Sequence, residues 1–244
     1  MMRCLILPLT LLLATGPAMA ESGHLRPGRT ALIEPAAPWL IDVAADIGFS
    51  TRAFVAGPDV LRVDTTRILV NAGIHLLPWL HAQAGAGWME SEVGHHRGEG
   101  GFAWQAGLHL SLIEQVIAAS PVAGVKQAMG LTLETHYRHA SSNRGQDDFN
   151  WHEWAVTPLF HYTVTRADNP LWHVRQPEAT ALQLGVQVST IDGKLGAQSV
   201  RENRNFAGVA GVQVLLANQW STQARAVLHG SGDRAFELRL GRYF

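Results

Sequence analysis

The chain ends on the stretch Ala235-Phe236-Glu237-Leu238-Arg239-Leu240-Gly241-Arg242-Tyr243-Phe244. Successive side chains of a strand point to opposite faces. Phe236, Leu238, Leu240 and Phe244 therefore share one face, and Glu237, Arg239 and Gly241 share the other. This pattern predicts a strand with an apolar and a polar side that ends on an aromatic residue.

The same alternation recurs along most of the chain. It marks nine further runs, at 39–54, 67–76, 80–91, 102–111, 125–138, 153–162, 182–189, 206–216 and 220–229. A tilted membrane-spanning strand needs about 9–11 residues, and most of these runs approach or exceed that length. Pro158 interrupts one run and predicts a bulge there. We expect ten strands, an even number as in single-chain bacterial barrels. Eight strands, with two runs absorbed into loops, is the alternative.

The front of the chain has the features of a secretory signal peptide over 1–20. Arg3 provides the positive charge, an apolar run follows, and Ala18-Met19-Ala20 matches a cleavage site. We expect Sec-type export with cleavage after Ala20, a periplasmic segment over 21–38 and a barrel over 39–244. The single cysteine, Cys4, lies inside the leader, so the mature chain has no disulfide.

Composition and charge narrow the class of protein. The formal net charge is −1 at pH 7, which predicts no nucleic-acid partner. Connections of two styles are expected, with long polar outer loops that include 94–100, 141–148 and 192–204, and tight turns after the second and eighth runs. Two inner connections, 113–124 and 165–179, are longer than this scheme requires. Tryptophans near the run ends predict girdles at the two membrane interfaces; they are Trp39, Trp79, Trp88, Trp104, Trp151, Trp154 and Trp220.

Together these patterns predict an all-β fold: a closed, antiparallel, up-and-down transmembrane barrel. An unpaired backbone group in hydrocarbon costs several kcal/mol, and only a closed sheet has no free edge. The pattern resembles the small outer-membrane barrels of Gram-negative bacteria, of the OmpA/OmpX type or a small porin-like family. The resemblance implies location in the cell outer membrane and a role of Phe244 as an assembly signal. It also implies contact with outer-membrane lipids, lipopolysaccharide and the assembly machinery, and a monomeric state.

Charged residues of both signs fall on the inward register. They are Asp42, Asp46, Arg52, Arg67, Lys126, Glu134, Arg138, Glu153, Arg225, Glu237 and Arg239. In a narrow barrel such charges pair into a polar core that blocks the bore. We therefore favour a structural plug over a conducting pore, although ten strands leave some space for a narrow path.

Six histidines share this inward register: His75, His81, His109, His136, His161 and His229. Imidazoles can bind metal or respond to pH. No pair has a diagnostic metal-ligand spacing, so we expect no metal and no cofactor.

One segment resembles the outer-membrane lipid A 3-O-deacylases, which carry a His-x-Ser pattern and a Glu. The resemblance implies that Ser141 is the nucleophile, His139 the base and Glu153 the residue that orients His139. Three departures count against it: Ser142 stands where that family has Asn, the motif is far from the chain end, and Glu153 falls on the inward register. A second His-x-Ser, at His109 and Ser111, shows that the pattern arises easily.

The sequence thus favours a non-enzymatic outer-membrane barrel with a structural or narrow porin-like role. The deacylase is one alternative. A surface adhesin or binding barrel that acts through its outer loops is another.

Overall fold

The computed structural model describes residues 40–93, 96–97, 100–120, 125–144, 147–166, 179–202, 205–216 and 219–244. The expected signal peptide and periplasmic segment lie outside this range. Within it, no helix has the length and apolar character to cross a membrane.

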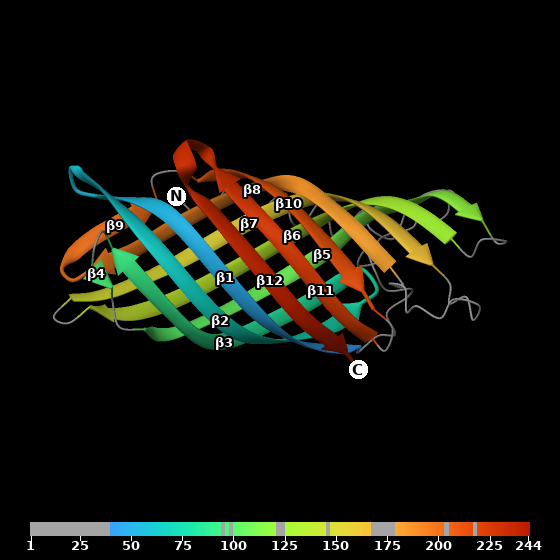
Figure 1. The fold of residues 1–244 in the computed structure, drawn as a ribbon, viewed down its shortest axis with the longest axis horizontal. Helices are drawn as coiled ribbons and strands as arrows, with labels where there is room; N and C mark the ends of the chain where they lie inside the picture. The colour runs from blue at the N-terminus through green and yellow to red at the C-terminus, as the bar shows by residue number, and fades with distance from the viewer. Residues whose placement is uncertain are drawn as a thin grey trace.

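Ten antiparallel strands form the wall of a closed barrel (Figure 1). They are β1 (Ile41–Ala56), β2 (Asp59–Leu77), β3 (Leu80–Val93), β5 (Gly101–Ser120), β6 (Val125–Arg144), β7 (Asp147–Arg166), β8 (Ala179–Leu195), β10 (Phe206–Leu215), β11 (Trp220–His229) and β12 (Arg234–Tyr243). The β8–β10 and β12–β1 ladders complete the ring. The prediction of a closed ten-stranded barrel is confirmed. Two short strands, β4 (His96–Arg97) and β9 (Gln198–Glu202), are additional.

The ring has two distinct ends. β1 begins and β12 ends at the same end, where Phe244 and Ile41 exchange backbone hydrogen bonds. We call this the terminal end and the opposite one the far end. At Pro158 the β7–β8 ladder skips two residue pairs but keeps the same register on either side. The predicted bulge is therefore absent, because the missing N–H interrupts the ladder without an inserted residue.

The wall is apolar outside over a band that starts at the terminal end. Large hydrophobic side chains such as Val70, Leu184, Leu228 and Leu240 are more than half exposed there. Aromatic residues border the band. Trp220 and Phe244 stand at the terminal end, and an outward cluster that includes Trp88, Phe102, Trp104 and Trp154 lies towards the far end.

The strands are longer than the apolar runs predicted. β1 and β2 meet at a tight Gly57-Pro58 turn, where a longer connection was expected after the first run. β5 continues as a strand to Ser120, so most of the expected 113–124 connection is sheet, with register shifts after Ser111 and after Val116. Parts of the connections at 94–100, 141–148, 165–179 and 192–204 lie outside the described residues.

The far end is closed differently from the rest of the ring. β10, β11 and β12 have ten residues each, whereas β1, β2 and β8 have 16 to 19. β9 spans the remaining gap, since it pairs with β8 on one side and with Phe54 and Val55 of β1 on the other. The far end is thus a narrower extension of the barrel beyond its short strands.

Candidate functional site

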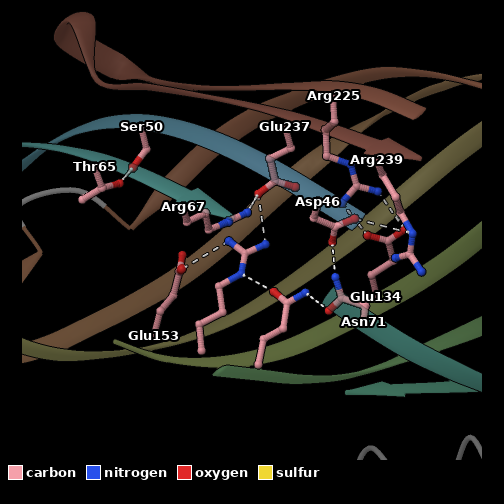
Figure 2. Close-up of polar contacts among 12 residues, drawn as sticks. Asp46, Ser50, Thr65, Arg67, Asn71, Glu134, Glu153, Arg225, Glu237 and Arg239 are labelled. Carbon is pink, nitrogen blue, oxygen red and sulfur yellow. Dashed lines mark hydrogen bonds and ion pairs between the residues drawn. The ribbon is translucent and has the colours of Figure 1, made fainter. Parts of the chain in front are cut away.

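The centre of the lumen is filled by a belt of paired charges from opposite walls (Figure 2). Glu237 of β12 accepts from Arg67 of β2 and from Arg138 of β6, the latter at 3.0 Å. Arg138 also lies 3.5 Å from Glu153 of β7. The Glu237–Arg138 contact crosses the bore, because β12 and β6 stand on opposite sides of the ring. Arg138 and Glu153 are cross-strand neighbours, and β1 alone lies between β2 and β12. The strand alternation places each of these side chains inward.

A second group of contacts extends the belt towards the far end. Arg52 donates to Glu153 at 3.0 Å and to Glu202 at 2.5 Å. Ser189 also donates to Glu202. The Arg52 guanidinium therefore forms ion pairs with two buried carboxylates, those of Glu153 and Glu202.

A third group extends the belt towards the terminal end. Arg239 binds Asp42 at 2.9 Å and lies 3.8 Å from Asp46. Asn71 donates to Asp46 (Figure 2). Gln105 donates to Asn71. The amides link the ion pairs into one network, as buried polar groups require.

Arg225 and Glu134 form a bidentate pair, with N–O distances of 2.7 and 2.8 Å. His109 approaches the same carboxylate at 3.4 Å. Its ring contacts His81, which in turn contacts His75 and lies 2.6 Å from Asp42. Among the described residues, no group of three or more His, Cys, Asp or Glu side chains is arranged to hold a metal ion.

Two cavities that border the network are small. Their volumes are about 30 and about 50 Å³, and both are lined by Arg67, Arg138 and Glu237. Since one water needs about 10–15 Å³, these cavities hold only a few water molecules. The three shared residues separate the two cavities.

An apolar cap fills the lumen at the far end, where a polar interior was expected. It consists of Phe54, Ala56, Val63, Leu69, Met89, Val93, Ala103, Ala140, Phe149, Trp151, Ile191 and Val200. Phe54 and Phe149 meet edge to face at 5.9 Å. The girdle assignment of Trp151 is therefore wrong. Its side chain is only 7% exposed and points inward, because it shares strand parity with Glu153.

The structure does not bring the three deacylase candidates together. Glu153 faces the lumen, is 2% exposed and binds Arg52 and Arg138. His139 lies on the other side of the wall, where its ring contacts that of Trp104. Ser141 donates to the backbone oxygen of Phe102 at 3.2 Å. The barrel wall separates the acid from the base, so this triad does not form.

Ten of the eleven inward charges named from the sequence make ion pairs with one another or with Glu202. The eleventh, Lys126, is the second residue of β6 and lies away from the belt. The predicted site lacks Glu202, Asn71 and Gln105. The alternation places Asn71 and Gln105 on the polar face of their strands, but the predicted belt contains charged residues alone. Glu202 lies in a short strand without an alternating pattern.

No family model and no curated protein sequence matches this chain. Solved barrels align with it at low similarity. The translocator domain of the autotransporter NalP from Neisseria meningitidis is 10% identical, over 86% of this chain and 89% of that one, with a TM-score of 0.36. The outer-membrane protease OmpT from Escherichia coli is 9% identical, over 85% and 98%, with a TM-score of 0.36. An outer-membrane channel from Pseudomonas putida F1 is 10% identical, over 87% and 100%, with a TM-score of 0.34. At these values the assignment of the fold rests on the strand ladders alone.

Proposed function

We propose that this chain is an integral outer-membrane β-barrel with a closed lumen and a structural role, not an open porin. The proposal rests on one observation: hydrophobic side chains face outward and charged side chains face inward, which is the reverse of a water-soluble protein. A ring without free edges exposes hydrophobic side chains such as Leu184 and Trp154 outside and pairs charges such as Arg225 and Glu134 inside. An exposed face this apolar is suited to lipid, and a closed ladder satisfies the backbone there.

One feature supports the orientation. β1 begins and β12 ends at the terminal end of a ring of ten strands. An even number of strands with both ends in the periplasm is the arrangement of single-chain bacterial barrels. The terminal end thus faces the periplasm, and the far end with its apolar cap faces outward.

Membrane insertion is tested by folding the purified mature chain into phospholipid vesicles and separating them by flotation. We expect the folded protein to float with the lipid and to aggregate in buffer without detergent. A folded protein that stays soluble without detergent or lipid contradicts the proposal.

Closure is tested in planar lipid bilayers. The wild type has two barriers, the belt at Arg138 and the cap at Trp151, so we expect no current steps above the lipid baseline. The double variant Arg138→Gly/Trp151→Gly removes one large side chain from each barrier and should conduct. Stable current steps from the wild type would instead identify it as a narrow pore.

A binding role at the cell surface is the second candidate, and the far end favours it. There β9 bridges β8 and β1 over a packed apolar core, which makes the outer extension a rigid support for loops. Cells that display the wild type or a variant with the 94–100 connection shortened can be compared for adhesion to defined matrix proteins. Equal adhesion would remove this candidate.

A further inference from the structure

The smaller of the two lumen cavities lies where the charged belt meets the apolar cap. Its volume is about 30 Å³. Phe54 and Trp151 of the cap contribute to its lining, and so do the belt arginines Arg52, Arg67 and Arg138. The cavity therefore combines an apolar wall with three guanidinium groups.

Two nitrogen atoms of this lining lack a hydrogen-bond partner in the part of the chain that the structure describes. They are Nε1 of Trp151 and Nε of Arg67. An indole N–H and a guanidinium N–H can only donate. Trp151 is more than nine-tenths buried, so its N–H cannot turn to bulk water instead. The cavity thus lacks a hydrogen-bond acceptor.

The acceptors in the lining are already engaged. Glu153 and Glu237 both accept from guanidinium groups of the belt. Among the described residues, no buried side-chain oxygen of this lining is without a partner. Ser50 and Thr65 share one hydrogen bond of 2.6 Å (Figure 2). Since only one hydroxyl hydrogen is used in that bond, the other is available to a further acceptor.

The charges of the lining point to the same kind of ligand. Three guanidinium groups stand against two carboxylates, those of Glu153 and Glu237. Glu202, which also pairs with Arg52, is not among the lining residues. The lining itself therefore has an excess of one positive charge, which one monovalent anion would balance.

We propose that this cavity binds one monatomic, monovalent anion, with chloride as the natural ligand. An anion only accepts hydrogen bonds, whereas a water molecule would add two O–H donors to a lining whose buried oxygens are engaged. One water needs about 10–15 Å³ of such volume, so a single halide fits and a phosphate or sulfate does not. Charge-assisted hydrogen bonds from Arg67 and Trp151 offset the lost hydration of the ion. The anion completes the hydrogen bonding where the belt meets the cap, which goes beyond the structural role proposed above.

Binding is tested by equilibrium dialysis of radioactive chloride against the full mature chain, folded in detergent micelles, with sodium gluconate holding the ionic strength constant. We expect saturable binding of one ion per chain. Trp151→Phe removes the N–H and keeps an aromatic ring, and should weaken binding about tenfold. The matched control is Trp154→Phe, the same change on the outer face of β7, which should bind as the wild type does. No saturable binding by the wild type, or equal affinity of the two variants, overturns the proposal.

The position is tested by anomalous scattering from wild-type crystals soaked in sodium bromide. We expect a bromide peak in the cavity between Trp151 and Arg67. A cavity that holds only ordered water at saturating bromide overturns the proposal. This measurement needs no variant, so it decides the question even if Trp151→Phe does not fold. Vesicle flotation and bilayer conductance report the proposed barrel function separately, so a failure of that function is distinguishable from a failure of halide binding.

Discussion

The belt makes a quantitative prediction about Glu237. In the described part of the chain, Arg67 makes its only ion pair with this carboxylate, and Arg138 shares it. The substitution Glu237→Gln leaves Arg67 without a negative partner inside the barrel. Removing one partner of a buried pair costs about 3–5 kcal/mol. The side chain of Glu237 is 21% exposed and Gln can still accept hydrogen bonds, so we expect the lower end, about 3 kcal/mol.

The measurement is the free energy of unfolding in urea, in phospholipid vesicles, followed by tryptophan fluorescence. Asp59→Asn is the control, since Asp59 is exposed at the β1–β2 turn and should change stability by less than about 0.5 kcal/mol. The double variant Arg67→Met/Glu237→Gln should recover part of the lost unfolding free energy, because it removes the Arg67 charge that Glu237→Gln leaves without its partner. A Glu237→Gln variant as stable as the control would refute the reasoning that paired charges hold the two sides of the lumen together.

Three further predictions concern other parts of the barrel. Leu184→Arg places a charge on the outer apolar band and should cost about 2–4 kcal/mol of unfolding free energy in vesicles, but little if that face is not in lipid. Gly85→Ala should destabilise by about 1–3 kcal/mol, because a Cβ there would overlap the Asn71 amide oxygen, whereas Gly208→Ala meets no atom and should be neutral in the same urea titration. Burial raises the pKa of Glu202, which lies in β9 beyond the apolar band, to about 7. The folded state then keeps the proton at pH values where the unfolded carboxyl, with its ordinary pKa of 4.5, has lost it. The stability of the far end should therefore fall as pH rises from about 4.5 to about 7 and then level off. Amide hydrogen exchange of β9 between about pH 5 and 8, corrected for intrinsic rates, should show this fall, and Glu202→Gln should abolish it.

The alternation was sufficient to predict the ring, because each strand carries an apolar and a polar face through the lipid. In β6, for example, Met129 and Leu131 point outward while Glu134 and Arg138 point inward. The same parity predicted which charges face inward. It did not predict which of them pair across the bore, because that depends on the curvature of the ring and the tilt of its strands.

The strand ends could not be predicted in the same way, because the pattern inverts beyond the apolar band. In β2, Val63 faces inward and Asp64 outward, the arrangement of a water-soluble barrel. A prediction based on apolar outer faces therefore ended several strands too early. It also missed the apolar cap, whose members Phe54 and Trp151 share parity with the lumen charges.

The β9 bridge also has a consequence for engineering this protein as a display scaffold. Its residues between Gln198 and Glu202 look like an ordinary exposed loop in the sequence, yet they seal the wall above three short strands. Foreign epitopes inserted there would open a lateral window and unpack the hydrophobic interior. Grafts belong instead at Gly57-Pro58, an exposed tip where the chain reverses between two long strands.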